Sequence, residues 1–264
     1  MVPDHVGQIE QGLVIRIMTY QSLIGRLRSA RGDPSLAVLE GFHPLKHAIR
    51  FGAELIEVVS LDVVKLEHLA ESIAPDIVHD LHNFTFEVPP TVFGQLAPVP
   101  PPTGVIAVAR RPTVSLTQII EDPAPAPVVL LENPRNPFNI GAAIRVSAAA
   151  GAAGVITTGA QDPWHSAALT GAAGLQYALP VSRTTTIPVC DRSLVAVDPS
   201  GEPIQNGPIP ANAILAFGSE RRGLSREIMD SADKCVSIPM RTGVSSLNLA
   251  TAVAVVLYGW RLGQ

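Results

Sequence analysis

Short apolar runs, separated by polar turns or by turns rich in glycine and proline, recur along the whole chain. In the first half these runs predict strands near residues 36–39, 54–59 and 104–109, and helices at 17–31 and up to Arg50. Strands and helices that alternate in this way indicate an α/β or α+β domain. We therefore expect a small α/β domain over residues 1–110.

The second half has a more regular pattern. Val128–Leu131 is apolar at every position, which is typical of a strand buried on both faces of a parallel sheet. Further strands are expected near residues 154–158, 179–181, 194–197, 213–217 and 236–238, with helices at 140–150, from Ser225, and at 246–260. This alternation predicts an open, parallel-sheet α/β domain over residues 127–264. Between the two domains, residues 111–126 are rich in proline, which favours an extended, semi-rigid linker without a core of its own.

Composition narrows the class of protein. Of the 264 residues 47% are apolar and the mean hydropathy is +0.28, which is ample for a buried core. No apolar run approaches the roughly 20 residues of a membrane span, and no secretion signal is visible, so a cytoplasmic protein is expected. Cys190 and Cys235 are far apart, and the histidines lack metal-ligand spacing, so no metal is expected. The net charge of −4 argues against indiscriminate nucleic-acid binding but leaves room for local basic groups.

Three blocks in the second half concentrate the candidate chemistry. They span residues 133–145, 217–225 and 238–250, and each places an apolar run just before a turn rich in Gly, Ser or Asn. Because ligands bind at the carboxyl ends of strands in open α/β sheets, the three blocks together predict one composite pocket.

The first block contains Asn139, which we expect to cap a helix that begins at Ile140. Arg145 is then a lone cation in an apolar, alanine-rich helix. Such a residue must find a partner or line a pocket, and a structural salt bridge or exposure to solvent are the alternatives.

In the second block Gly218 lets a ligand approach the backbone closely, and Glu220 is placed to accept hydrogen bonds from Asn139 or Arg145. In the third block Ser246 is expected to cap the last helix. The start of that helix, with Ser246 and Asn248, suits a carboxylate or phosphate.

In order and spacing, the three blocks resemble the signature motifs of the SpoU (TrmH-like) family of RNA 2′-O-ribose methyltransferases, over roughly residues 128–264. The resemblance implies a trefoil knot in the C-terminal domain and Arg145 as the principal catalytic residue. It also implies that Asn139, Glu220, Ser246 and Asn248 are catalytic residues. It also implies an S-adenosylmethionine site formed by Phe217, Gly218, Ile238, Pro239 and Leu247.

The same resemblance implies an RNA substrate, with rRNA favoured over tRNA, and a homodimer. Val253, Val256, Leu257 and Trp260 of the last helix suit either the dimer contact or an ordinary core. The N-terminal domain resembles a small RNA-binding domain. Because a guanidinium keeps its proton below about pH 12, we expect Arg145 to orient an RNA phosphate and to stabilise the developing alkoxide. A neighbouring phosphate and a transiently deprotonated arginine both remain open as proton acceptors.

One segment departs from the family pattern. Residues 169–175 keep a glycine but lack the arginine and serine that many members carry there. His43, His47, Trp164 and His165 are expected to be ordinary core or surface side chains. A non-catalytic RNA-binding protein with the same fold is the first alternative. A different nucleotide-dependent α/β enzyme is the second, although the chain lacks the G-x-G-x-x-G and P-loop motifs.

Overall fold

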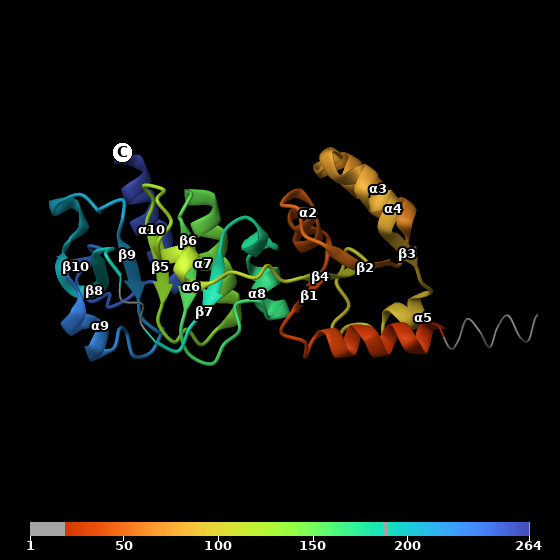
Figure 1. Cartoon of the computed structure of the whole chain (residues 1–264), viewed down its shortest axis with the longest axis horizontal. Helices are drawn as coiled ribbons and strands as arrows, with labels where there is room; N and C mark the ends of the chain where they lie inside the picture. The colour runs from red at the N-terminus through yellow and green to blue at the C-terminus, as the bar shows by residue number, and fades with distance from the viewer. Residues whose placement is uncertain (1–18, 187–189, 264) are drawn as a thin grey trace, which may run out of the picture.

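The computed structural model describes residues 19–186 and 190–263. Two β-sheets lie side by side along the long axis of the molecule (Figure 1). The first has four strands in the order β1-β4-β2-β3, and the second has six in the order β10-β8-β9-β5-β6-β7. The prediction of an α/β fold with a parallel sheet in the second half is confirmed.

The first sheet is mixed. Its strands are β1 (Leu36–Glu40), β2 (Leu55–Ser60), β3 (Thr85–Glu87) and β4 (Val105–Arg110). β4 pairs antiparallel with β1 and β2, and β2 pairs parallel with β3. The accompanying helices are residues 19–30, α2 (Phe42–Arg50), α3 (Val63–Ile73), the 3-10 turn η1 (Pro75–Ile77), α4 (Val78–Phe84) and α5 (Pro90–Phe93). Positions 17 and 18 of the predicted first helix lie outside the described residues.

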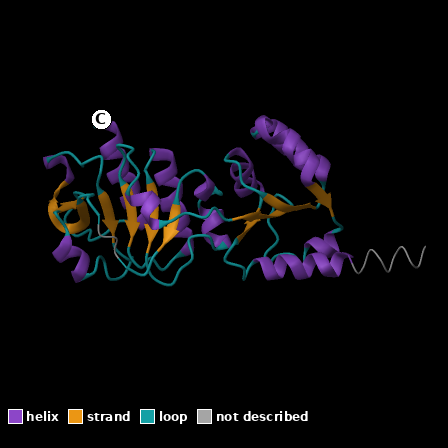
Figure 2. Cartoon of the chain, in the orientation of Figure 1, coloured by secondary structure: helices purple, strands orange, loops and turns teal. Residues whose placement is uncertain are grey.

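Both faces of this first sheet are covered by helices (Figure 2). Along β4, Ile106 and Val108 belong to a cluster with the 19–30 helix and α5, whereas Val105 and Ala107 belong to the main core. Alternating positions of a strand point to opposite faces, so an apolar strand can serve two cores. The main core continues without interruption into the second sheet.

The second sheet is parallel in every pair. Its strands are β5 (Val128–Leu131), β6 (Gly154–Thr157), β7 (Val181–Arg183), β8 (Leu194–Pro203), β9 (Ile214–Phe217) and β10 (Lys234–Ser237). Its helices are α7 (Pro137–Ala150), α8 (Ser166–Gly171), α9 (Arg226–Ser231) and α10 (Leu249–Leu262), with 3-10 turns η2 (Leu175–Tyr177) and η3 (Ile204–Asn206). β5, β6 and β9 are buried at every position, as their apolar sequences require.

The connection between the sheets is more structured than the proline pattern indicates. Residues 116–120 form α6 (Leu116–Ile120), which begins with a reciprocal capping box between Ser115 and Gln118. Ile119 is fully buried in the main core. The guanidinium of Arg192 donates to the carbonyl oxygens of three residues in and after this helix, Ile120, Asp122 and Ala126. The expectation of an extended connection therefore fails over α6, because an apolar side chain there packs into the core.

The predicted cap of α7 is wrong. The helix begins at Pro137, and the side chain of Asn136 accepts a hydrogen bond from Phe138 N at 2.9 Å. Proline is favoured in the first turn because its φ is already helical and its missing N–H would have no helical partner there. Asn139 therefore lies inside the first turn, and its side chain is free for other contacts.

The predicted cap of α10 is also wrong. Asn248 caps this helix, and its Oδ1 accepts from Ala250 N at 3.0 Å. Ser246 lies in the preceding loop. In contrast, Ser225 caps α9 as predicted. None of the helices among the described residues has the length and apolarity needed to cross a membrane.

α8 joins the two sheets, since it contacts β1, α2 and α7. Just after it, the carbonyl oxygen of Ala173 lies 2.6 Å from Nδ1 of His47. Arg111 forms an ion pair with Asp162 at 2.7 Å across the same junction. The two halves are thus held together by polar contacts as well as by the shared core.

Candidate active site

A cavity of about 480 Å³ opens at the carboxyl ends of β9 and β10 and beside the middle of β8. This volume is within the range of about 300–1,000 Å³ that is usual for ligand pockets. We call it the sheet-edge cavity. Its walls come from four segments of the chain. The first is residues 197–199, the second is residues 217–221 and 223, the third is residues 238, 240 and 245–247, and the fourth is residues 249 and 252 at the start of α10.

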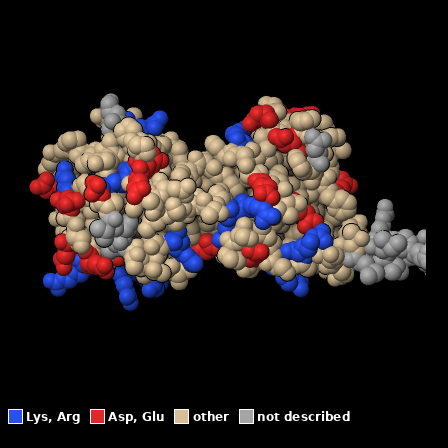
Figure 3. All heavy atoms as spheres, in the orientation of Figure 1, with Lys and Arg blue, Asp and Glu red and all other residues tan. Residues whose placement is uncertain are grey.

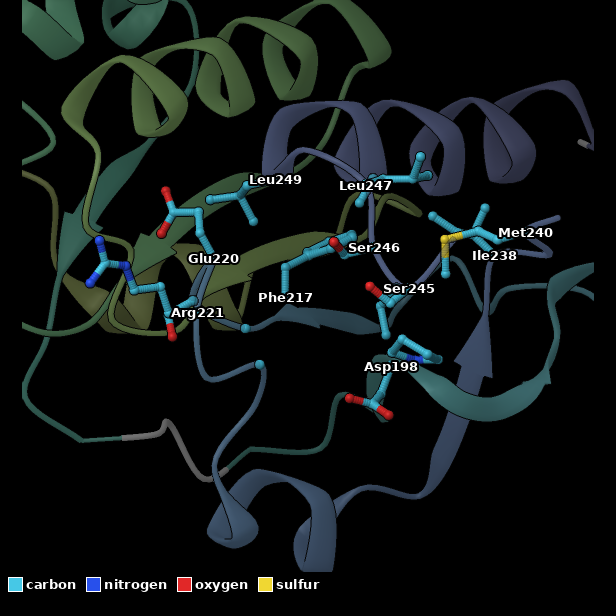
Figure 4. A pocket seen from close by; sticks show the side chains of 16 residues that line it. Asp198, Phe217, Glu220, Arg221, Ile238, Met240, Ser245, Ser246, Leu247 and Leu249 are labelled. Carbon is cyan, nitrogen blue, oxygen red and sulfur yellow. The ribbon is translucent and has the colours of Figure 1, made fainter. Parts of the chain in front are cut away.

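The sheet-edge cavity contains most of the predicted cofactor residues. Phe217, Gly218, Ile238 and Leu247 all line it. In Figure 4, Phe217 and Ile238 face one another across the cavity from different segments. Pro239 does not line it. Alternate residues of an extended chain point to opposite sides, so Pro239 is directed away while its two neighbours line the wall.

Gly218 is required by the turn that follows β9. Ser219 and Gly223 exchange backbone hydrogen bonds of 3.1 and 3.0 Å, which close the loop tightly. A Cβ at position 218 would overlap the backbone of Gly223 and Leu224. Only glycine lets the loop close in this way, and the same residue forms part of the cavity wall.

A chain of hydrogen bonds joins three of the predicted catalytic residues. Nδ2 of Asn139 donates to Oε1 of Glu220 at 2.9 Å. Oδ1 of Asn139 in turn accepts from Nδ2 of Asn248 at 3.0 Å. Asn248 thus links the network to the start of α10, and Ser246 lines the adjacent cavity. Residues from all three sequence blocks therefore meet in one hydrogen-bonded network, but only the second and third blocks line the sheet-edge cavity.

Glu220 is held as a carboxylate. Burial opposes its ionisation, but the hydrogen bond from Asn139 and those from the backbone N–H groups of Arg135 and Asn136 outweigh it. The pKa of Glu220 therefore lies below its ordinary value. The ionised carboxylate anchors the start of α7 and fixes the Asn139 amide.

Arg145 is not part of this network. It follows Asn139 by six residues on α7, which places it about 9 Å further along the helix and about 120° around it. Its side chain is exposed and lines a second cavity, of about 340 Å³, between the two halves of the molecule. Of the two donors considered for Glu220, only Asn139 is bonded to it among the described residues.

We call this second space the junction cavity. Its walls are α2 and residues 40 and 41 before it, the loop at 101–103, Arg145 of α7, and Thr170 and Ala173. Thr170 belongs to the segment that lacks the family's arginine and serine. His47 makes the contact with Ala173 described above, and Nδ1 of His165 accepts from Ala167 N at the start of α8. Trp164 is buried with its ring edge-on to Tyr177. These three side chains have the ordinary structural environments expected of them.

Sequence reasoning missed several residues of both cavities. Asp198, Met240 and Ser245 line the sheet-edge cavity. Asp198 directly follows a predicted strand, so its position at a strand's carboxyl end was a usable signal. His43 and Lys46 line the junction cavity, and nothing in the local sequence marks them.

The profile of the SpoU rRNA methylase family matches residues 126–258, about half of the chain. A parallel sheet with three converging blocks at its carboxyl edge defines an α/β enzyme class. This match makes the assignment specific: the chain belongs to the SpoU family of RNA methyltransferases.

Similar proteins agree with this assignment. An uncharacterised tRNA/rRNA methyltransferase of Synechocystis sp. is 28% identical over 93% of each chain. A 23S rRNA adenosine 2′-O-methyltransferase of Streptomyces laurentii is 27% identical over 90% of each. The SpoU methyltransferase AviRb of Streptomyces viridochromogenes, solved in complex with AdoMet, has the same fold, with a TM-score of 0.70 at 24% identity over 94% of this chain and 97% of that one. Some mycobacterial relatives match over only 46% of their own length.

Proposed function

We propose that this protein transfers the methyl group of S-adenosylmethionine to a ribose 2′-hydroxyl of structured RNA, with rRNA as the favoured substrate. The observation that carries the proposal is a cavity lined by the second and third sequence blocks, to which the Glu220–Asn139–Asn248 network joins the first block. The named activity of the Streptomyces laurentii relative supports the 2′-hydroxyl as acceptor and rRNA as substrate.

The residues of the sheet-edge cavity fit this cofactor. Phe217, Ile238 and Leu249 offer apolar surface for an adenine ring. Gly218 lines the cavity, and its lack of a side chain lets the turn that follows β9 pack closely against it. Asp198 lines the same cavity and supplies a carboxylate that can accept from hydroxyl or amino groups. S-adenosylmethionine supplies an activated methyl group on a positively charged sulfur.

The polar network positions the acceptor. Ser246 lines the cavity and offers a hydroxyl to a ribose, and Asn248 caps the helix that begins beside it. The side-chain amide of Asn248 donates a hydrogen bond to Asn139, and the side-chain amide of Asn139 donates one to Glu220. Glu220 is thus a positioning residue that acts through Asn139. Correct placement of reacting groups is a large part of catalysis, and an error of about 1 Å can lower a rate about 100-fold.

Arg145 is assigned to the RNA. A protonated guanidinium has five N–H donors and no acceptor, so Arg145 does not take the hydroxyl proton in this proposal. It orients a backbone phosphate, whereas its position in the junction cavity, about 9 Å along α7 from Asn139, does not support the expected stabilisation of the developing alkoxide. Its exposed position on the same helix as Asn139 suits it to contact a strand of RNA that extends beyond the acceptor nucleotide.

The test is transfer of a radiolabelled methyl group from S-adenosylmethionine to total rRNA and total tRNA, followed by mapping of 2′-O-methylated positions. The proposal predicts one or a few ribose methylations in rRNA that need both cofactor and protein. Tight RNA binding with no methyl transfer to either RNA would instead favour the non-catalytic alternative.

The proposed enzyme acts as a homodimer that uses the exposed face of α10. Val253, Val256, Leu257 and Trp260 are buried in the core of the chain, so they do not supply the contact. Their outward neighbours are apolar: Val255, Tyr258 and Leu262 are 40%, 39% and 82% exposed. Spacings of three and four residues put these three on one face of the helix, and a second copy would cover it.

The proposal keeps the N-terminal part, residues 1–110, as an RNA-binding domain, with residues 111–126 as the connection. It also keeps the trefoil knot, which rests on membership of the family.

A further inference from the structure

The junction cavity collects cationic groups from both halves of the molecule. Lys46 and His43 come from α2, and Arg145 comes from α7, about a hundred residues later in the chain. Figure 3 shows basic and acidic side chains on both halves of the face that it draws. A gathering of like charges at an interface of two halves is unfavourable in itself, so its presence requires an explanation.

These cations have no direct counter-charge. Among the described residues, no carboxylate lies within 4.0 Å of the charged groups of Lys46 and Arg145 or of the ring nitrogens of His43, which is uncharged near neutral pH. Glu40, which also lines the cavity, is engaged by Arg31 at 2.6 Å. Asp76, in η1, is paired with Arg50 through contacts of 2.6 and 2.7 Å.

The mutual repulsion is visible in the ionisation of the side chains. Burial, followed by Lys46 and Arg145, lowers the pKa of His43. The pKa of Lys46 is also lowered, mainly by burial and to a smaller extent by the positive charges of Arg50 and Arg145. The carboxylate of Asp76 acts in the opposite direction. An anion in the cavity would reverse these electrostatic contributions, because an opposite charge within a few ångströms favours the protonated form.

We infer that the junction cavity is a binding site for a phosphate group of the RNA backbone, held by Lys46 and Arg145 with His43 beside them. This inference rests on the proposed function and extends it, because it makes α2 part of the substrate site. Arginine offers a planar fork that matches a phosphate, and lysine adds a mobile point charge. The cavity volume of about 340 Å³ leaves room for such a group.

The site explains how the two halves act on one substrate. Arg145 lies on the helix that begins at the sheet-edge cavity, and Lys46 lies on the helix that packs against the junction. A strand of RNA fixed by both would be held in register with the acceptor site. Phosphate contacts of this kind position a nucleic acid and carry no sequence information.

The first arm of the test uses full-length Lys46→Gln, with Lys65→Gln as the matched control, because Lys65 is on α3 of the same half and its side chain is 84% exposed. Binding to protein-free 23S rRNA is measured from 50 to 200 mM KCl. Loss of one phosphate contact should weaken binding on the order of 5- to 10-fold at 100 mM salt and reduce the salt slope by about one. Lys46→Arg should restore both, and Lys65→Gln should leave both unchanged.

The second arm uses inorganic phosphate as the probe and NMR of the His43 ring as the readout. Phosphate should raise the pKa of His43 in the wild type and do so less in Lys46→Gln. If Lys46→Gln binds 23S rRNA as the control does, the RNA assignment is overturned even if phosphate still acts. If phosphate leaves the pKa of His43 unchanged and Lys46→Gln binds rRNA as the wild type does, the junction cavity is not a phosphate site.

Failure of this inference is distinguishable from failure of the proposed function. Methyl transfer to rRNA by Lys46→Gln with an unchanged KM overturns the phosphate site and leaves the methyltransferase in place. A wild-type protein that binds cofactor but neither binds nor methylates rRNA removes the proposed substrate, and with it the RNA assignment of the junction cavity.

Discussion

The sheet-edge cavity and the junction cavity differ in where their walls come from. The first is formed by segments of one parallel sheet and the start of α10, and its charged lining includes the carboxylates of Asp198 and Glu220. The second is formed where α2 faces α7 and the end of α8, and its basic lining includes Lys46 and Arg145. The first cavity therefore offers carboxylates to a cofactor with a positively charged sulfur, and the second offers cations to a phosphate.

This difference teaches how the proposed reaction is divided. The cofactor site needs only the fold of the second sheet and the tight turn at Gly218. The substrate site needs the two halves to be docked, because Lys46 and Arg145 belong to different halves. Substitutions at Gly218 and at the apolar walls of the first cavity should therefore affect cofactor affinity, and those in the second should affect RNA affinity and turnover.

The largest effect is expected from Arg145→Ala. Loss of its phosphate contact should misplace the acceptor ribose, and an error of about 1 Å can lower a rate about 100-fold. S-adenosylmethionine affinity should persist because Arg145 does not line that cavity. Methyl transfer to rRNA and calorimetric titration measure the two quantities. Arg226→Ala is the control, since that side chain is 92% exposed. Undiminished turnover would remove Arg145 from the mechanism.

Glu220→Ala should lower kcat about 10- to 100-fold with little change in cofactor affinity. It frees Asn139 and the backbone at the start of α7 without removing a group from the reacting atoms. Glu220→Gln keeps a carbonyl acceptor for Asn139 and should restore part of the rate. A fall in cofactor affinity as large as the fall in kcat would show that Glu220 serves the cavity wall and not the position of Asn139.

A charge on the exposed face of α10 should separate the subunits. Leu262→Glu and Tyr258→Glu are each expected to weaken dimerisation by at least about tenfold, because burying an unpaired carboxylate is costly. Sedimentation equilibrium measures the association. Val64→Glu is the control, because Val64 is 60% exposed on α3 in the other half. A dimer that withstands both α10 substitutions would place the subunit contact elsewhere.

The smallest effect concerns pH. The pKa of Glu220 is lower in the folded protein than its ordinary value of 4.5. A depressed carboxylate pKa contributes stability that is fully present above the ordinary pKa and is lost as the pH falls through the folded value. The Asn139 side-chain amide resonances should therefore change only below about pH 4.5. Glu220→Gln should remove the transition, and a transition near neutral pH would contradict the assignment.

The sequence predicted the parts that depend on contiguous residues. Wholly apolar runs identified β5 and β9, and the turn after β9 identified Gly218. Helix starts were less predictable, because Asn136 and Asn139 compete as caps and Pro137 decides in favour of Asn136. Ile238 lines the sheet-edge cavity, whereas Pro239, the next residue, points away from it. A shift of one residue along the chain would exchange the two.

The position of Arg145 and the roles of Lys46 and His43 depend on distant contacts. The phase of α7 turns Arg145 away from Asn139, and the packing of α2 on the junction then brings Lys46 to it. Local patterns contain no information about which helix of one half docks on which helix of the other. Sequence motifs therefore located the sheet-edge cavity and missed the junction cavity.

The central claim is that the sheet-edge cavity binds S-adenosylmethionine. Calorimetric titration of the wild type, Gly218→Ala and Arg145→Ala with S-adenosylmethionine and S-adenosylhomocysteine, with and without total rRNA, tests it directly. Circular dichroism must first show that Gly218→Ala is folded. The account predicts saturable binding of both ligands to the wild type and to Arg145→Ala, and loss of binding in Gly218→Ala. Absence of binding to the wild type under both conditions, or equal binding by Gly218→Ala, would contradict it.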